Sequence, residues 1–528
     1  MSKSLGDIFE TVARNIDPEA PSVLCDGKIL TWSEFDQASN ALGRRLLDVG
    51  LGLQAKVGLY MRNSPDYLIA FAACVKARLC PFNINYRYGP EEVAYLLDNA
   101  DCEALIFDCE FAQVVTAIPS TATLRLRISA HGAATGAELI SKTCAGNGEF
   151  LEISRDPDDL ILLYTGGTTG LPKGVMWTSG IVWENLLPGL ALPGKTPPRT
   201  LEALGAQIYS GEGRYRVYIA PPLMHGTGLV AALGALFRGG SVVLSGRPSF
   251  DPERMLQEVQ DLHCVSLSIV GEAFARPLLD VLRGAPGRFD VSHVLAVTSS
   301  GMMWSPETKL GLLEFMPKAQ LVDALSASEA PAFATMVTTR DSAPKNVQFQ
   351  LTGAVVLRPE DLTPIRPGYG EVGVIAKAGI LPLPLGYYKD PERTARTYVM
   401  INGVRHMVGG DHATVEADGS IRLLGRGSHC INTGGEKVYP EEVEEALKTH
   451  SEVRDALVFG IPDPRFGQTV AAVVSTRKSI PVDELDSHVR NCLAGYKVPR
   501  RIVLVGVVPR GPNGKADYSA ARFIFEGH

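Results

Sequence analysis

The first third of the chain alternates segments of helical spacing with short apolar segments, and this rhythm limits the folds open to it. Apolar residues recur every three or four positions over 33–49, which predicts a helix capped by Thr31 or Ser33. The expected elements that follow are a strand at 56–60, helices at 66–76 and 91–100, and a strand at 104–108. Strands that alternate with helices form parallel sheets covered by helices, so the pattern predicts an α/β protein.

Composition narrows the class of protein. The 528 residues are 45% hydrophobic and 21% charged, the balance of a globular chain of several structural units. The net charge of −7 argues against a nucleic-acid partner, because such binders normally carry a basic excess. No apolar segment reaches the ~20 residues of a membrane span, and the N-terminus lacks the apolar core of a signal peptide. The nine cysteines contain no CxxC pair, which favours a reduced, cytoplasmic protein.

Composition changes near residues 425–427, where we place a boundary between Arg426 and Gly427. The next predicted element is a helix at 440–450, with glutamates in its first turn and Lys448 and His450 at its end, an order that complements the helix dipole. The further elements predicted after it are strands at 456–460, 469–475 and 501–505 and a helix at 482–492. The chain is thus expected to form domains 1–426 and 427–528. Within the first domain we expect an exposed loop at 192–216 and strands at 217–220, 265–270 and 294–298.

The strongest local signal is the segment 162–174, LLYTGGTTGLPKG. An apolar strand runs into glycines, which allow backbone N–H groups to approach an anion, and into hydroxyl and ammonium donors. The residues that would wrap a phosphate are Thr165, Gly166, Gly167, Thr168, Thr169, Gly170 and Lys173. The segment is not a Walker A loop, because Lys173 follows Pro172 and precedes Gly174. A flexible surface loop is the alternative interpretation.

Four further residues have both a functional and a structural interpretation. Asp411 beside a glycine suits hydrogen bonds from ribose hydroxyls, or is a turn aspartate. Arg426 between two glycines could reach a phosphate or be a linker arginine. Lys515 in a Pro-Asn-Gly turn could project into a cleft and stabilise a charged transition state, or be solvated. His225 after an apolar strand is a pocket residue or a core histidine.

The segment TGGTTGLPKG resembles the signature loop of the adenylate-forming superfamily of acyl-CoA synthetases, adenylation domains and luciferases. Companion segments occur in that family's order: 31–34, 81–86, 222–226, 386–388 with 391–394, 410–411, 418–419, 425–426 and 512–515. The segment GGEKVYPEEVE at 434–444 is typical of the acyl-CoA synthetase branch. The resemblance implies a large N-terminal domain of parallel-sheet α/β layers plus a β-barrel-like subdomain, with a smaller mobile C-terminal α+β domain.

The resemblance also implies a role for each matched position. Glu329 would be catalytic and hold Mg²⁺, and Lys515 and His225 would complete the catalytic set. The expected ATP and coenzyme A contacts are Thr165, Gly166, Gly167, Thr168, Thr169, Gly170, Lys173, Asp323, Ala324, Leu325, Ser328, Asp411, Arg426, Gly434, Gly435 and Lys437. The expected acyl contacts are His225, Val270, Gly271, Ser300, Gly301 and Met302.

Three segments depart from the family pattern. Leu325 and Ser326 replace its Tyr-Gly, which removes an aromatic ring from the adenine site. Ser300-Gly301-Met302 replaces its Gly-Gly-Ala turn with larger side chains. Ser428-His429 replaces a charged pair at the hinge between the domains. We therefore expect an active but atypical member.

The implied activity is that of an acid-thiol ligase, an AMP-forming acyl-CoA synthetase. It would use ATP, Mg²⁺ and coenzyme A to activate a small-molecule carboxylic acid. Met302, Met303 and Trp304, together with the segment 269–274, resemble the bacterial synthetases that act on bulky acids. This resemblance implies an acid of long-chain fatty, steroid or terpenoid type. An enzyme that loads a carrier protein and a non-catalytic acyl- or nucleotide-binding homologue remain open as alternatives. So does a homodimer.

Overall fold

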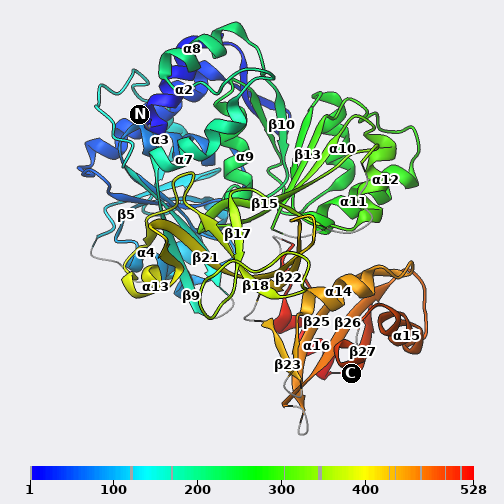
Figure 1. Ribbon diagram of the computed structural model, residues 1–528. Coiled ribbons are helices and arrows are strands. Elements are labelled where there is room, and N and C mark those ends of the chain that lie inside the picture. The colour runs from blue at the N-terminus through cyan, green and yellow to red at the C-terminus, as the bar shows by residue number, and fades with distance from the viewer. Residues whose placement is uncertain are drawn as a thin grey trace.

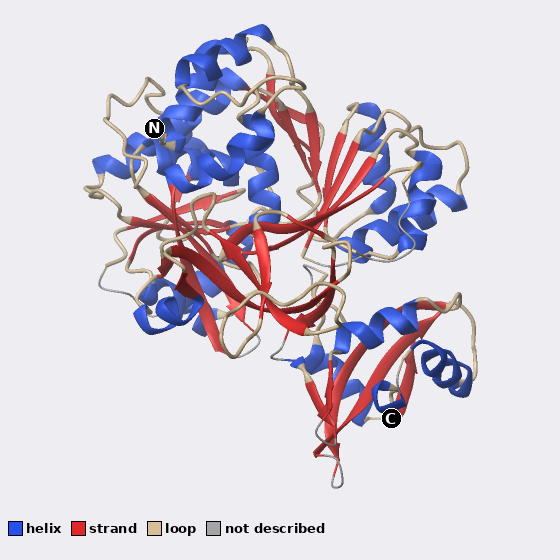
Figure 2. Ribbon diagram, in the orientation of Figure 1, coloured by secondary structure: helices blue, strands red, loops and turns tan. Residues whose placement is uncertain are grey.

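The computed structural model describes residues 3–118, 123–167, 170–301, 304–342, 348–426, 429–433, 436–463, 467–493, 495–511 and 514–527. These residues form four sheets (Figures 1 and 2). The first three lie in the larger body, and the fourth lies with the C-terminal helices in a separate, smaller body (orange to red in Figure 1). No helix of the described residues is long and apolar enough to cross a membrane.

The first sheet has eight strands in the order β19-β9-β8-β4-β3-β5-β6-β7. Their bounds are β3 (Lys56–Tyr60), β4 (Cys80–Asn83), β5 (Cys102–Asp108), β6 (Leu126–Ala130), β7 (Glu138–Leu139), β8 (Leu160–Gly167), β9 (Gly170–Thr178) and β19 (Gly386–Tyr387). All neighbours are parallel except the pairs β8–β9 and β9–β19. The parallel sheet predicted for the first third of the chain is confirmed.

The second sheet has nine strands in the order β16-β15-β14-β13-β12-β10-β11-β1-β2. Their bounds are β1 (Pro21–Cys25), β2 (Lys28–Thr31), β10 (Arg216–Ile219), β11 (Ser241–Leu244), β12 (Ser266–Ile269), β13 (Ala296–Ser300), β14 (Gln320–Ala327), β15 (Ala330–Thr338) and β16 (Gln350–Leu351). The six central strands, from β1 to β14 in this order, are parallel. Parallel strands place their carboxyl ends at one edge, where ligands of α/β sheets usually bind.

Helices cover both parallel sheets. One hydrophobic core lies between them and takes side chains from α1 (Leu5–Asn15), α2 (Trp32–Asp48), α3 (Pro65–Lys76), α7 (Ser179–Leu186), α8 (Leu201–Ser210) and α9 (Gly226–Leu236). A second core packs α10 (Pro252–Asp261), α11 (Gly271–Gly284) and α12 (Pro306–Phe315) on the outer face of the second sheet (Figure 1). The outer face of the first sheet is covered by α4 (Pro90–Asn99) and α5 (Ala112–Ala117), and the short α6 (Ile140–Cys144) packs beside α2.

Helix starts follow the local sequence. Thr31 caps α2: its hydroxyl accepts from the Glu34 amide at 3.2 Å, and the Glu34 carboxylate accepts from the Thr31 amide at 2.8 Å. Of the two caps predicted there, Thr31 and Ser33, the structure has Thr31, which forms this reciprocal capping box with Glu34. The predicted exposed loop at 192–216 is wrong in part, because α8 occupies 201–210. Thr200 caps this helix, and Gly211, in the left-handed conformation at φ 73°, ends it.

The third sheet is antiparallel and has five strands. They are β17 (Ala354–Leu357), β18 (Val372–Ala378), β20 (Tyr398–Ile401), β21 (Val404–Val415) and β22 (Ile421–Arg426), with the helix α13 (Pro391–Thr397) beside β19 and β20. This sheet shares a hydrophobic core with β15, which joins it to the second sheet.

The fourth sheet forms the smaller body. Its strands are β23 (Ile431–Thr433), β24 (Glu436–Val438), β25 (Val453–Asp463), β26 (Gly467–Thr476) and β27 (Arg501–Val505). The helices α14 (Pro440–Lys448), α15 (Val482–Cys492) and α16 (Tyr518–Glu526) pack against it. The parallel sheets, the antiparallel sheet and the α+β C-terminal body confirm the predicted fold class.

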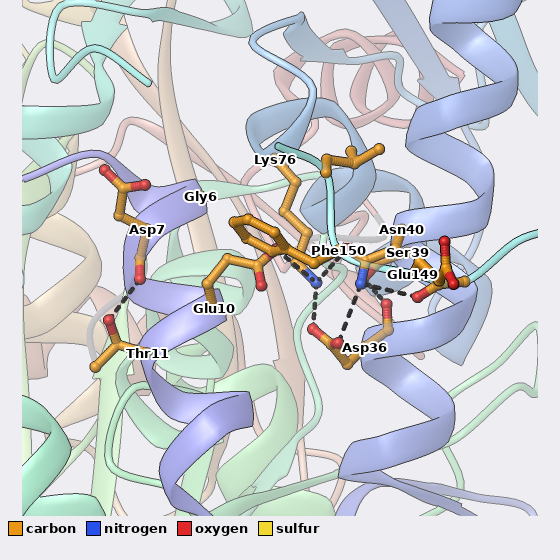
Figure 3. Close-up of polar contacts among 12 residues, drawn as sticks. Gly6, Asp7, Glu10, Thr11, Asp36, Ser39, Asn40, Lys76, Glu149 and Phe150 are labelled. Atoms are coloured by element: carbon orange, nitrogen blue, oxygen red, sulfur yellow. Dashed lines mark hydrogen bonds and ion pairs between the residues drawn. The ribbon is translucent and has the colours of Figure 1, made fainter. Parts of the chain in front are cut away.

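A buried charge cluster ties the first three helices together (Figure 3). The Lys76 ammonium is fully buried and lies 2.5 Å from Asp36 Oδ1, 3.0 Å from Asn40 Oδ1 and 3.6 Å from Glu10 Oε1. Arg155 lies beside it and donates to the Lys76 carbonyl at 2.7 Å and to Asp7 at 3.2 Å. The cluster therefore joins α1, α2 and α3 through ionic groups that neighbouring charges satisfy.

Candidate active site

The glycine-rich segment forms a hairpin between β8 and β9, with Thr165 opposite Lys173. Thr168 and Thr169 lie outside the described residues, as do the side chains of 166–171. Asn83 fixes the hairpin, because its amide donates to the Tyr164 carbonyl at 2.9 Å and its oxygen accepts from the Tyr164 amide at 2.7 Å. The predicted loop is thus the end of a strand pair, with Gly166, Gly167 and Gly170 in the strands themselves.

Lys173 lies on β9 of this hairpin, and its side chain is half-buried. Its ammonium lies 4.0 Å from Asp390 Oδ2, and Asp390 caps α13. The neighbouring Gly174 packs against the Tyr164 ring so closely that a Cβ would lie 2.9 Å from it. Only glycine fits there without a shift of the ring, so the close packing sets the path of the chain just after Lys173.

Glu329 follows β14 and is held by two tyrosines. The Tyr387 hydroxyl donates to Glu329 Oε1 at 2.7 Å, and the Tyr398 hydroxyl donates to the Glu329 carbonyl at 2.9 Å. The Trp177 indole donates to the carbonyl of the preceding Ser328 at 3.0 Å. These contacts fix the backbone and one carboxylate oxygen, which orients the carboxylate.

The Glu329 carboxylate suits a magnesium ion. Mg²⁺ is usually bound by one or two protein carboxylates together with waters and substrate phosphates. The described residues contain no group of three or more His, Cys, Asp or Glu side chains that could hold a metal by themselves. A single oriented carboxylate is the donor set expected of a metal that arrives with a nucleotide.

Asp323 is buried on β14 and forms an ion pair. Lys309 Nζ lies 2.5 Å from Asp323 Oδ2, and the Lys309 ammonium lies 5.4 Å from the centre of the Trp304 ring. Burial raises the pKa of Asp323 to about 6, although Lys309 opposes this rise. On the same strand, Ala324 pairs with Ser300, and Leu325 packs partly against the core of the third sheet.

Four of the expected acyl residues, Val270, Gly271, Ser300 and Gly301, lie at the carboxyl ends of two neighbouring strands, β12 and β13. A Cβ on Gly301 would lie 3.7 Å from Val270 Cγ1, so the two segments are in contact. The Gly271 amide donates to Ser299 Oγ at 2.8 Å, and Ser300 Oγ lies 2.8 Å from Ser326 Oγ. Met302 and Met303 lie outside the described residues.

His225 caps α9 and has a buried ring. Its Nε2 has no hydrogen-bond partner among the described residues. Burial, and then the positive charges of Lys515 and Arg87, lower the pKa of His225 to about 4. The ring is therefore neutral near pH 7, and Lys515 of the smaller body is one of the two charges that lower its pKa.

Lys515 lies in a turn whose ends are joined by hydrogen bonds. The Gly511 amide donates to the Lys515 carbonyl at 2.7 Å, and Gly514 has a positive φ of 73°. Arg510 donates to both oxygens of Asp455, at 2.5 and 2.6 Å, and to the Gly514 carbonyl at 3.4 Å. This bidentate pair holds the base of the turn that carries Lys515.

Asp411 and Arg426 lie opposite each other on β21 and β22. The side chain of Arg426 is outside the described part of the chain, as are Gly434, Gly435 and the side chain of Lys437. At Gly425, with φ 102°, a methyl group would overlap the carboxylate of Glu441 on α14. The two bodies are therefore in close contact where the chain passes from one to the other.

Sequence reasoning did not assign site roles to Tyr387, Lys309 or Arg510. The Gly-Tyr-Tyr segment at 386–388 was available as a signal for Tyr387. Lys309 and Arg510 carried no such signal, because their partners Asp323 and Asp455 are distant in the sequence.

Solved structures share this fold over the whole chain. ATP-bound MatB from Rhodopseudomonas palustris superimposes with a TM-score of 0.82 at 22% identity, covering 100% of this chain and 99% of MatB. The anthranilate CoA ligase AuaEII in complex with anthranoyl-AMP gives a TM-score of 0.82 at 20% identity, covering 99% and 97%.

Family matches identify the class. The AMP-binding enzyme family matches residues 9–382, and the AMP-binding enzyme C-terminal domain matches residues 442–515. The chain belongs to the AMP-binding enzyme family, as its resemblance to the adenylate-forming superfamily predicted.

Relatives that align over nearly the full length carry more specific names. A medium/long-chain-fatty-acid–CoA/3-oxocholest-4-en-26-oate–CoA ligase from Mycolicibacterium smegmatis is 38% identical, covering 100% of this chain and 97% of the relative. The protein of the same name from Mycobacterium tuberculosis (strain H37Rv) is 39% identical, covering 96% and 93%. A 3-oxocholest-4-en-26-oate–CoA ligase from Rhodococcus rhodochrous is 36% identical, covering 99% and 96%.

Proposed function

We propose that this chain is an AMP-forming acyl-CoA synthetase that activates bulky hydrophobic carboxylic acids. The observation that carries the proposal is the hydrogen bond from Tyr387 that holds the Glu329 carboxylate beside the glycine-rich hairpin. The glycine-rich hairpin adjoins β19, whose Tyr387 orients Glu329, and Lys515 acts electrostatically on His225. Relatives at 36–39% identity named as fatty-acid and steroid-acid CoA ligases support the same assignment.

In the first half-reaction, a carboxylate oxygen of the acid attacks the α-phosphorus of ATP. The new bond joins that oxygen to phosphorus, and pyrophosphate leaves with the electrons of the broken P–O bond. The Lys515 ammonium stabilises the charge that develops on the phosphoryl oxygens. Glu329 would hold Mg²⁺, which neutralises phosphate charge when bound. The neutral His225 ring supplies a hydrogen-bonding nitrogen at the acyl end.

In the second half-reaction, the coenzyme A thiol attacks the acyl carbon of the adenylate. A carbon–sulfur bond forms, the bond from acyl carbon to AMP breaks, and the thiol proton leaves to solvent. Splitting the condensation in this way makes each step an attack on an activated group. We propose that Gly434, Gly435 and Lys437 bind coenzyme A. We propose that the nucleotide is bound by the hairpin residues together with Asp323, Asp411 and Arg426.

The proposal includes the domain boundary between Arg426 and Gly427. Strand β22 ends at Arg426 in the third sheet, and β23 begins at Ile431 in the fourth, which supports a boundary there. We further propose a cytoplasmic location and a small-molecule acid as the partner. A homodimer is kept as a prediction that light scattering would test.

Pyrophosphate release across a panel of acids tests the proposal. We expect strong turnover with octanoate, palmitate or a 3-oxo steroid side-chain acid, and weak turnover with acetate. Good turnover of acetate alone would overturn the substrate class. Carboxylate labelled with ¹⁸O should transfer one labelled oxygen to AMP, and its absence from AMP would overturn the first step.

Lys515→Ala should slow pyrophosphate release by about 10²- to 10³-fold, the usual cost of losing one group that stabilises transition-state charge. It should spare thioester formation from a pre-made acyl-adenylate. Lys478→Ala, on an exposed lysine of the same body, is the matched control. Equal loss in both half-reactions would contradict the role assigned to Lys515.

A further inference from the structure

An ion pair joins the smaller body to the helices of the second sheet. Arg477 follows β26, and its Nη2 lies 3.1 Å from both carboxylate oxygens of Glu307. Glu307 belongs to the first turn of α12, which packs in the outer core of that sheet. The pair therefore links the body that carries Lys515 to α12, the helix that follows the expected acyl segment.

Glu307 is held in place by a second arginine from its own body. Arg276 Nη1 lies 3.4 Å from Glu307 Oε1, and Arg276 Nε lies 3.1 Å from Glu272 Oε1. Burial acts to raise the pKa of Glu307, but the hydrogen bonds from Arg477 and Arg276 outweigh it and the pKa is lowered. The carboxylate is thus ionised and already oriented for Arg477.

Glu272 anchors this arrangement to the acyl side. Its buried carboxylate accepts from the Ser305 amide at 2.8 Å and from Thr308 Oγ1 at 2.6 Å. Ser305 caps α12 just after Trp304 and the expected pocket residues. Arg477 thus pairs with Glu307, and Arg276 connects Glu307 to Glu272. Glu272 in turn fixes the backbone at Ser305, beside the expected pocket residues.

We propose that Arg477 is a positioning residue for the first half-reaction, and that its ion pair with Glu307 holds the smaller body where Lys515 reaches the acyl and phosphate groups. The inference rests on the proposed function, because it assigns Lys515 to adenylation. The pair joins two bodies connected by one chain passage near Gly425, so a change in their relative orientation separates its atoms.

The strength of the pair suits such a role. The side chains of Arg477 and Glu307 are 32% and 47% exposed, so solvent screens their attraction. An exposed pair of this kind shifts an equilibrium by about two- to fivefold. That is enough to favour one orientation and weak enough to release within each catalytic cycle.

Single-turnover kinetics of the two half-reactions test the proposal. Arg477→Gln should slow pyrophosphate release with ATP and palmitate by about two- to fivefold. It should leave the rate of thioester formation from pre-made palmitoyl-adenylate and coenzyme A unchanged or faster. Lys478→Gln is the matched control, because that neighbouring lysine pairs with Glu452 of its own body at 3.7 Å and is 79% exposed.

Two further measurements exclude a merely structural effect. Arg477→Lys keeps the charge and should recover most of the first-step rate. Raising the salt concentration should slow the first step of the wild type towards that of Arg477→Gln, because exposed pairs are screened. Equal slowing of both half-reactions, or no slowing of the first, would overturn the proposal. A wild type that releases no pyrophosphate with any acid would instead overturn the proposed function.

Discussion

Lys76 and Lys309 are both almost completely buried, yet their surroundings differ. Lys76 meets Asp36, Asn40 and Glu10 from two other helices (Figure 3). Arg155 donates to the Lys76 carbonyl beside this group. Among the described residues, Lys309 meets one carboxylate, that of Asp323, and faces the Trp304 ring.

The difference separates two uses of a buried cation. The charged groups of the Lys76 cluster pair with one another and lie on α1, α2 and α3. The cluster therefore stabilises the packing of these three helices. The Lys309 pair joins α12 to Asp323 on β14, six residues before Glu329, and the Asp323 carboxylate is one of the expected nucleotide contacts. We infer that Lys76 acts on stability alone and that Lys309 acts on stability and on nucleotide binding.

The largest effect is expected from Lys76→Met. The substitution removes the buried cation shared by Asp36 and Glu10 and leaves the buried Glu10 carboxylate with Arg155, at 3.5 Å, as its one ion pair among the described residues, which costs about 3–5 kcal/mol of unfolding free energy. Urea unfolding measures the loss, and the KM for ATP of the folded fraction should stay at the wild-type value. A changed KM for ATP in Lys76→Met would contradict the inference that Lys76 acts on stability alone.

Lys309→Met should cost about 3 kcal/mol for the same reason, and it should also raise the KM for ATP about tenfold, a change worth about 1.4 kcal/mol. The pKa of Asp323, no longer opposed by a cation, would rise further, and the neutral carboxyl would be a weaker acceptor than the carboxylate for the adenine amino group that we expect it to bind. Adding Asp323→Asn to this variant should restore much of the stability without restoring the KM. If the KM for ATP of Lys309→Met stays at the wild-type value, the Lys309–Asp323 pair acts on stability alone, as the Lys76 cluster does.

A smaller effect is expected from pH. The pKa of Asp323 is raised to about 6 by burial, so the carboxylate gains a proton as the pH falls through that value. Lys309, Trp304 and Glu445 are the groups that act on it. The KM for ATP should therefore rise a few-fold between pH 7 and pH 5.5, and Asp323→Asn should flatten this rise. For folding the sign is opposite: the raised pKa makes this group's contribution to stability fall as pH rises from about 4 to 6.

The smallest effect is expected from Arg45→Met, which removes a surface ion pair with Glu138. Both side chains are more than a third exposed, so the loss should stay below about 1 kcal/mol. Urea unfolding measured beside Lys76→Met provides the comparison. A loss as large as that of Lys76→Met would mean that burial is not what distinguishes the two lysine sites from surface pairs.

Periodicity and capping were sufficient for most of the fold. Alternating apolar segments predicted β3, β5, α3 and α4 but not β4, β6, β7 or β19. Thr31 marked the start of α2. The helix α8 was missed because Pro- and Gly-rich sequence surrounds it. Thr200, the spacing of Leu204 and Ile208, and Gly211 were nevertheless available as signals of a capped helix.

The site was less accessible to sequence reasoning. Lys515 and Glu329 were identified through the family resemblance, since a lysine in a turn and a glutamate after a strand have ordinary structural explanations. The contact between Tyr387 and Glu329 spans 58 residues. The pairs Lys309–Asp323 and Arg477–Glu307 depend on how helices and sheets pack, which no local pattern encodes.

The contact at Gly425 has a practical consequence. A single added methyl group at this position collides with Glu441 in the arrangement described above, and the backbone conformation there already disfavours a side chain. Gly425→Ala would thus work as a wedge between the two bodies and enrich whatever alternative arrangement the chain adopts. A crystal structure of such a wedged protein would show whether that alternative arrangement presents the residues proposed for the coenzyme A side.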